Sequence, residues 1–347
     1  MKIIGCDFHP SYQQIAWLNE ETGELREVSL HHASGQAQRF YAALPRPVRV
    51  GMEAVGNSLW FEKLLAELKH ELWIGDAARI RSLAVRRQKT DRRDAQHLLE
   101  LMTSGRFPRL WVPSVEQRDL RQLLLHRHKL VAMRRTVKNQ LQHLALNQGL
   151  QRKSRLWTRA GRQQLRELPL VGWTARRRDE LLELLDQLDS RIGDLDRAVD
   201  EQAAQHPAVG LLMTHPGVGP VVGLAYVLTL GPVERFARGK QVASYLGLIP
   251  RESSSGGRQR LGAISKQGNP WLRSLLVEAA QTAARLEPEL RRDYRRLAQR
   301  KHRAVAKVMV ARKLAVRLYW MLREHQPYSP PPAVRMQESP SHSVVAP

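Results

Sequence analysis

The feature that most constrains the fold is a series of short apolar segments in the first hundred residues, each bounded by turn residues such as glycine, proline and aspartate. Apolar runs of this length predict β-strands, and longer stretches with a helical period predict α-helices. Helices are expected after Ser58 and after Thr90, since both residues can cap a first turn. A third helix is expected over 35–44, and strands are expected at 3–6, 12–18, 25–30, 48–52 and 72–74. The sequence therefore predicts an α/β domain over residues 1–112.

The order of these elements is three strands in a meander, then helix, strand, helix, strand and helix, which is the ribonuclease H-like layout. Four carboxylates occupy related places in it. Asp7 ends the first strand and Glu53 ends the fourth, and the last helix carries Asp91 and Asp94 three residues apart. Residues three apart share a helix face, and the first and fourth strands are neighbours in this layout. We therefore expect the four carboxylates to converge at one edge of the sheet.

Four carboxylates at one place repel one another unless cations hold them. Mg²⁺ (or Mn²⁺) would suit such a site, because these ions take hard oxygen ligands and keep positions open for phosphate. Two such ions about 4 Å apart can hold the attacking and leaving oxygens of a phosphodiester. Singly, each residue has a plainer interpretation, as a turn residue or as an acid favoured by the helix dipole. Order, spacing and strand-end placement together favour a metal site.

The charge of the chain indicates its partner. The 56 lysines and arginines against 33 acidic residues give a formal net charge of +23. A protein this basic attracts polyanions by releasing their counterions, so nucleic acid is the expected partner.

The single cysteine, Cys6, excludes an intramolecular disulfide and fits a reducing cytoplasm. We expect no signal peptide and no membrane span, because the longest apolar stretch, 221–230, is shorter than the roughly 20 residues a span needs.

Heptad patterns mark the middle of the chain, residues 113–205. A spacing of seven runs from Leu123 to Leu144, and a second series with steps of four and three runs from Leu181 to Val199. Both predict long helices in a coiled coil, packing on each other or on a second subunit. A helical linker with one amphipathic face would give the same pattern.

A mainly α C-terminal domain is expected over 206–325, followed by a Pro/Ser-rich tail, 326–347, that we expect to be disordered. Within the domain, the segment 214–220 looks like the hairpin of a helix-hairpin-helix. There Gly217 and Gly219 would let backbone N–H groups approach a DNA phosphate. A tight turn between two core helices is the alternative.

A loop over 245–262 is dense in serine, glycine and arginine. A serine flanked by glycines can expose its hydroxyl as a nucleophile, and nearby cations can bind the scissile phosphate. Taken alone, such a loop is more commonly a linker. The cations expected to contact nucleic acid here are Arg258, Arg260, Lys266 and Arg273.

Several motifs taken together resemble those of the DEDD transposases, the insertion-sequence family numbered one hundred and ten, over nearly the whole chain up to about Arg323. The resemblance implies a RuvC-like N-terminal domain with the four carboxylates as its acidic residues, and a catalytic serine in the Ser-Gly loop. By motif that serine is Ser255, just before Gly256, with Ser253 and Ser254 leaving the register open. The motifs are Gly5-Cys6-Asp7, Met52-Glu53-Ala54, Thr90-Asp91-Arg92-Arg93-Asp94-Ala95, Pro216-Gly217-Val218-Gly219 and the run from Gly247 to Arg273.

The resemblance also implies a mechanism and partners. It implies a recombinase guided by a structured non-coding bridge RNA that pairs with donor and target DNA. The serine would form a covalent 5′-phosphoserine link, with metal held at the acidic site. The two sites would be composite, shared between subunits of a homo-oligomer (dimer or tetramer), and the heptad patterns would serve assembly. We expect the protein in the bacterial cytoplasm, associated with the nucleoid.

Two other functions stay open at this point. A metal-dependent Holliday-junction resolvase or endonuclease would use water as the nucleophile and need no serine. A non-catalytic nucleic-acid-binding protein on a disabled nuclease fold would lack a carboxylate, and all four are present.

Overall fold

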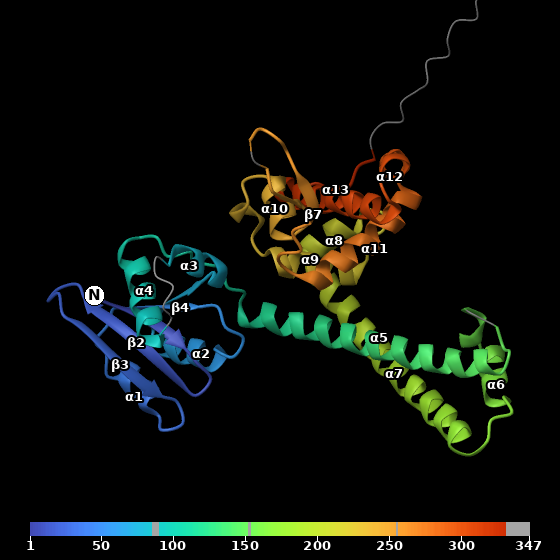
Figure 1. Ribbon diagram of the computed structural model, residues 1–347, viewed down its shortest axis with the longest axis horizontal. Coiled ribbons are helices and arrows are strands. Elements are labelled where there is room, and N and C mark those ends of the chain that lie inside the picture. Colours follow the sequence, from blue (N-terminus) through green and yellow to red (C-terminus); the bar gives the residue numbers. More distant parts are fainter. Residues whose placement is uncertain (85–89, 152–153, 255, 331–347) are drawn as a thin grey trace, which may run out of the picture. The chain divides into compact units, whose positions relative to one another are not determined.

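The computed structural model describes residues 1–84, 90–151, 154–254 and 256–330. The chain forms two compact units, divided between Val112 and Pro113, and each is described by itself (Figure 1). The first unit is an α/β domain. Its elements are β1 Lys2–Phe8, β2 Tyr12–Asn19, β3 Leu25–His31, α1 Gln36–Ala42, β4 Val48–Glu53, α2 Leu59–Glu67, β5 Glu71–Gly75, α3 Ala77–Leu83 and α4 Asp91–Thr103.

The five strands of this unit form one sheet in the order β3-β2-β1-β4-β5. Strands β1, β2 and β3 pair antiparallel as a meander, and β4 and β5 run parallel to β1. The arrangement is compatible with the RuvC-like layout that the order of elements predicts. Each parallel crossover passes through a helix, as parallel neighbours require.

The sheet is covered on both faces (Figure 1). Because successive strand residues point to opposite faces, β1 contributes Ile4 and Cys6 to one core and Ile3 to the other. The first core packs against α1 and α2 through Tyr41, Phe61 and other residues. The second packs against α4 through Ala95, Leu98, Leu99 and Met102.

Two details of this unit differ from the sequence-based expectations. Ser58 stands at the start of α2, but its hydroxyl makes no capping bond and donates instead to Glu62 Oε1 at 2.9 Å. Helix α3 was not predicted, although Asp76 caps it by accepting from the backbone N–H groups of Ala78 and Arg79. The motif was visible in the sequence, but a helix of seven residues is too short to show a clear period.

The second unit is mainly helical and begins with two long helices, α5 Val115–Asn147 and α7 Gly172–Ala204, which lie side by side (Figure 1). They pack through a common cluster that includes Val137 and Leu141 of α5 and Leu185 and Ile192 of α7. Its other elements are η1 Ser154–Trp157, α6 Arg159–Arg166, α8 Pro207–Met213, α9 Pro220–Leu230, η2 Val233–Arg235, α10 Gly239–Tyr245, β6 Pro250–Glu252, β7 Leu261–Ile264, α11 Pro270–Leu286, α12 Pro288–Arg300 and α13 Arg303–Glu324.

The main core of the second unit extends across residue 206, where the sequence suggests a new domain. It joins Leu124 of α5 and Val199 of α7 to residues of α8, α9, α11 and α13.

The segment 250–264, predicted as a loop, contains an antiparallel hairpin in which Pro250 pairs with Ile264 and Glu252 with Leu261. The predicted disordered tail lies, from residue 331 onward, outside the described residues. Every helix in the described part of the chain is too short or too polar to span a bilayer.

Candidate metal centre and serine loop

Two glycines of the sheet, Gly5 and Gly51, face helix α4 where it lies directly on the strands. A Cβ at Gly5 would stand 2.3 Å from the carbonyl oxygen of Ala95 and 2.5 Å from the backbone nitrogen of Leu99. Gly51, its register partner on β4, would place a Cβ 2.2 Å from Sδ of Met102. A side chain at Gly5 would meet backbone and push the helix away, whereas one at Gly51 would meet only the flexible end of Met102, so Gly5 is the glycine that the close approach requires.

The same face of the sheet carries the strand-end carboxylates. Asp7 and Glu53 lie two residues beyond Gly5 and Gly51, so strand alternation directs their side chains to the α4 face. Strands β1 and β4 are parallel neighbours whose register ends at the pair Cys6 and Met52. Asp7 and Glu53 are the next residues on the two strands, as the sequence predicts.

Helix α4 brings its acidic first turn to Asp7. Thr90 caps the helix by accepting from the backbone N–H of Arg93, and this places Asp91 and Asp94 in the first turn. Ligand atoms of Asp7, His9 and Asp91 all lie within 4.8 Å of one another. Glu53 is half-buried and lies outside that group of three.

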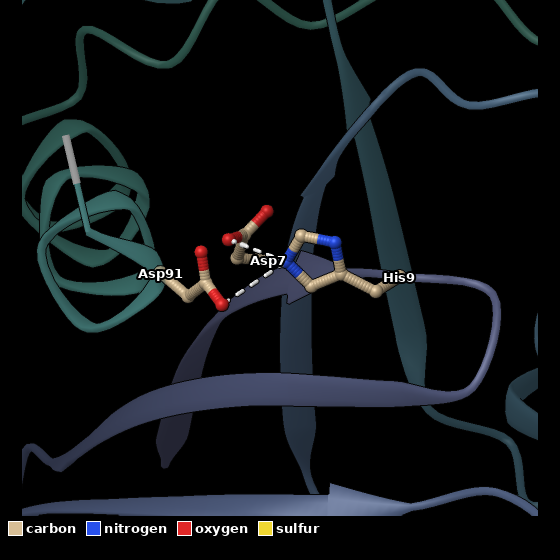
Figure 2. Close-up of side chains that lie close together, drawn as sticks. All are labelled: Asp7, His9 and Asp91. Carbon is tan, nitrogen blue, oxygen red and sulfur yellow. Dashed lines mark hydrogen bonds and ion pairs between the residues drawn. The ribbon is translucent and has the colours of Figure 1, made fainter.

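His9 stands between two of the carboxylates, and sequence reasoning did not identify it. Figure 2 shows its Nε2 directed at both Asp7 and Asp91. That atom is 3.1 Å from Oδ2 of Asp7 and 3.6 Å from Oδ2 of Asp91. The ring stacks on Tyr12, with centroids 4.7 Å apart, and the hydroxyl of Tyr12 donates to Oδ2 of Asp91 at 2.6 Å. The only available signal was the closeness of His9 and Tyr12 to Asp7 in the sequence.

The electrostatics of the cluster follow from burial and charge. Burial raises the pKa of Asp7 above its usual value, the proximity of His9 lowers it, and the negative charges of Asp94 and Asp91 raise it further. Asp94 thus acts on Asp7 through its charge. The hydrogen bond to Asp91 raises the pKa of Tyr12 and keeps that phenol protonated. Clustered carboxylates that repel one another, with hard oxygen donors, fit a divalent cation of the magnesium class.

The serine loop lies in the second unit, between β6 and β7. The hydroxyl of Ser254 donates to Oε1 of Glu252 at 2.6 Å and accepts from the backbone N–H of Arg260 at 3.2 Å. The N–H of Ser253 donates to the carbonyl of Arg260 at 3.0 Å, which extends the hairpin by one bond. Ser255, the serine predicted by motif, lies outside the described residues. Glu252 was not singled out from the sequence.

The predicted nucleic-acid contacts have different surroundings. Arg258, Arg260 and Lys266 are exposed. Arg273 is half-buried. Burial lowers its pKa, and its guanidinium donates to the carbonyls of Leu246 and Gln267. This arginine therefore holds together the base of the loop.

Gly217 and Gly219 lie in the turn between α8 and α9. Gly217 has φ of +87°, and a Cβ there would stand 2.7 Å from both the carbonyl oxygen of Ala279 and the nitrogen of Ala283. Packing against α11 therefore explains this glycine without any ligand. A Cβ at Gly219 would meet nothing within 4 Å.

Comparison with known proteins gives matches over both units. The model of the transposase IS116/IS110/IS902 family matches residues 209–295, and a DEDD transposase model matches residues 4–148. A probable family 20 transposase of Pseudomonas aeruginosa is 31% identical over 341 residues, covering 94% of this chain and 98% of that protein. The transposase for insertion sequence element IS1111A of Coxiella burnetii is 32% identical over 58% of this chain and 56% of its own length. The transposase for IS1328 of Yersinia enterocolitica is 26% identical over 83% of this chain and 86% of its own.

Together, the sheet with its acidic edge and these matches define the class of protein as a transposase, an enzyme that cleaves and rejoins DNA. The chain belongs to the IS110 family of insertion-sequence DEDD transposases. The family predicted from the motifs is thereby confirmed. The DEDD model spans Asp7, Glu53, Asp91 and Asp94, and the other model spans the serine loop.

Proposed function

We propose that this transposase is an RNA-guided recombinase that breaks DNA with a serine of the loop 253–255, and that Asp7, Glu53, Asp91 and Asp94 hold divalent cations. The observation that carries the serine proposal is the hydrogen bond of 2.6 Å from Ser254 to Glu252. The bond shows that a carboxylate, Glu252, lies within the serine loop, where it can serve as the base for the nucleophile, which the motif assigns to Ser255. Exposed Arg258 and Arg260 supply positive charge for a phosphate beside it.

The proposed acidic site is supported by its donor chemistry. Carboxylate oxygens are the ligands that Mg²⁺ and Mn²⁺ prefer. When bound, such ions supply positive charge that stabilises the developing charge on a phosphodiester. The chain's own residues position the carboxylates: Tyr12 orients Asp91 by hydrogen bonding, and His9 contacts both Asp7 and Asp91.

The proposed reaction exchanges one phosphate ester bond for another, so the DNA can be rejoined without an outside source of energy. The serine oxygen forms a bond to phosphorus while the bond from phosphorus to the 3′ oxygen breaks. The hydroxyl proton passes to the carboxylate of Glu252, and the departing 3′ oxygen takes up a proton from solvent and leaves as a 3′-hydroxyl. Attack by a second strand's 3′-hydroxyl on the 5′-phosphoserine then restores the serine and rejoins DNA.

The proposal includes three kinds of partner. A bridge RNA would select donor and target DNA by base pairing, and Lys266, Gly217 and Gly219 would contact nucleic acid backbone. A homo-oligomer would combine the acidic site of one subunit with the serine loop of another. The heptad residues Val137 of α5 and Leu185 and Ile192 of α7 are buried against each other within the chain, so the assembly would use other surfaces of these two helices.

A covalent-adduct assay tests the proposal. The protein is mixed with RNA transcribed from the flanks of its element, Mg²⁺, and labelled donor and target DNA, and is then resolved on a denaturing gel. We expect an adduct that is lost in Ser255→Ala, persists in Ser254→Ala and maps to Ser255 by mass spectrometry. Loss in Ser254→Ala with an adduct mapped to Ser254 would shift the nucleophile by one residue. Cleavage without any adduct would support hydrolysis by water, as in a junction resolvase.

A further inference from the structure

The second unit contains a large groove that the proposed function does not use. It encloses about 1300 Å³ between the β6–β7 hairpin and helices α10, α12 and α13. Pockets for small molecules typically enclose about 300–1,000 Å³. The larger volume favours a segment of a polymer as the occupant.

The lining of the groove is strongly basic. Seven lysines and arginines line it, against one carboxylate, Glu289. Arg296 and Lys313 are neutralised by Asp293, and Arg317 pairs with Glu289 at 2.7 Å. Among the described residues, no acidic partner is within 4.0 Å of the remaining four, which are Lys240, Lys266, Lys301 and Arg312. The groove therefore has a positive charge that a polyanion can neutralise.

The same groove has exposed apolar side chains between its cations. Trp320 is 42% exposed, Val305 47% and Leu261 55%. The indole of Trp320 is supported from one side by the ring of Tyr319, whose centroid lies 5.0 Å away at 61°. A supported aromatic ring among cations is the usual platform for an unpaired base, and base stacking does not depend on sequence. A duplex hides the faces of its bases and would leave these apolar surfaces uncovered.

We propose that this groove binds an unpaired stretch of DNA, with phosphates on Lys240, Lys301 and Arg312 and a base stacked on Trp320. The inference rests on the proposed function for the identity of the polymer as DNA. The hairpin that lines the groove also carries the serine loop, because β6 and β7 flank residues 253–260. A strand in the groove would thus lie on the same hairpin as the proposed nucleophile. A second copy of this chain is a poorer occupant, since its net charge is also positive.

The test measures binding apart from catalysis. The full chain carrying Asp7→Ala is titrated into a short labelled oligothymidine, without metal, and followed by fluorescence anisotropy. We expect Trp320→Ala to weaken binding about 5- to 150-fold, the range for loss of one stacked base, and Trp320→Phe to restore most of it. Trp173→Ala, which removes a tryptophan of α7 that is 79% exposed and lies outside the groove, should change nothing. Duplex binding should be equal in all four proteins.

A second measurement tests the cations. The double variant Lys301→Gln/Arg312→Gln should reduce the slope of log affinity against log salt by about 1.4, because each phosphate contact with a single strand contributes about 0.7. The matched double variant Arg159→Gln/Arg191→Gln, exposed and outside the groove, should keep the original slope.

Three results would overturn the proposal. They are unchanged single-strand binding in Trp320→Ala, binding of the same sequence as RNA at least tenfold tighter than DNA, and self-association of the protein that Trp320→Ala abolishes. The last would make the groove an interface between copies. Because the binding assay uses a protein without Asp7 and without metal, a missing covalent adduct would count against the serine mechanism and leave this result unaffected.

Discussion

Gly5 of β1 lies directly beneath Ala95 of α4, so close that a Cβ on the glycine would be 2.3 Å from the alanine carbonyl oxygen. The contact determines how near the first turn of α4 approaches the end of β1. Asp7 is two residues beyond Gly5, and Asp94 directly precedes Ala95 in sequence. The distance between sheet and helix therefore controls the distance between the carboxylates that the two elements carry.

Gly5→Ala should displace α4 and separate the acidic residues. We expect a loss of stability of about 1–3 kcal/mol, the usual cost of overpacking, and loss of the rise in melting temperature that Mg²⁺ or Mn²⁺ gives the parent. Thermal melts with and without metal measure both effects. Gly56→Ala is the matched control, because a Cβ at Gly56 meets nothing within 4 Å. Unchanged metal-dependent stabilisation in Gly5→Ala would show that the contact does not position the site.

Asp7→Asn should stabilise the metal-free protein at neutral pH while abolishing its response to metal. Burial and neighbouring acids raise the pKa of Asp7 in the folded state above its unfolded value, so the ionised carboxylate opposes folding. That penalty is absent below the unfolded pKa of about 3.9 and develops as pH rises through the folded pKa. The gain in melting temperature should accordingly shrink as pH is lowered toward 4.

The control for this variant is Glu67→Gln, which neutralises an exposed carboxylate on α2 in the same unit. It should leave both the stability and its pH dependence unchanged. A metal-free Asp7→Asn protein that melts below the parent at neutral pH would contradict the electrostatic account.

His9→Ala should increase the effect of metal on stability. In the structure the Nε2 of His9 contacts Asp7 and Asp91, so it is one of the few attractive partners of these repelling carboxylates. Without it, the metal-free protein should melt at a lower temperature, and saturating Mg²⁺ should recover more of the loss than in the parent. A smaller response to metal in His9→Ala would instead identify the imidazole as a ligand.

The four carboxylates could be proposed as a site from sequence because their positions follow local rules. Strand ends place Asp7 and Glu53, and helix periodicity with the Thr90 cap places Asp91 and Asp94. His9 has no such local signal, since nothing near it in the sequence shows that its ring reaches Asp91. The glycines Gly5 and Gly51 likewise have a reason only when α4 is packed on the sheet.

The β6–β7 hairpin was missed for a different reason. Its strands are exposed, so they lack the apolar alternation that indicates a strand, and backbone pairing alone defines them. The composition of the loop, rich in serine, glycine and arginine, favours a turn or linker on local grounds. The hydrogen bond between Glu252 and Ser254 joins residues two apart, but composition alone does not show the backbone geometry that allows it.

Composite active sites predict that inactive subunits complement one another. Asp7→Ala removes a residue of the acidic site, and Ser255→Ala removes the proposed nucleophile, so each protein alone should be inactive. If an oligomer pairs the acidic site of one subunit with the loop of another, mixing the two variants creates some sites in which both halves are intact. Adduct formation and strand exchange should then return to a measurable fraction of the parent activity. Mixing Asp7→Ala with Glu53→Ala provides the control, because both changes affect the same half and no intact site can form. Failure of the first mixture, under conditions where the subunits exchange, would mean that each chain uses its own acidic site and its own serine.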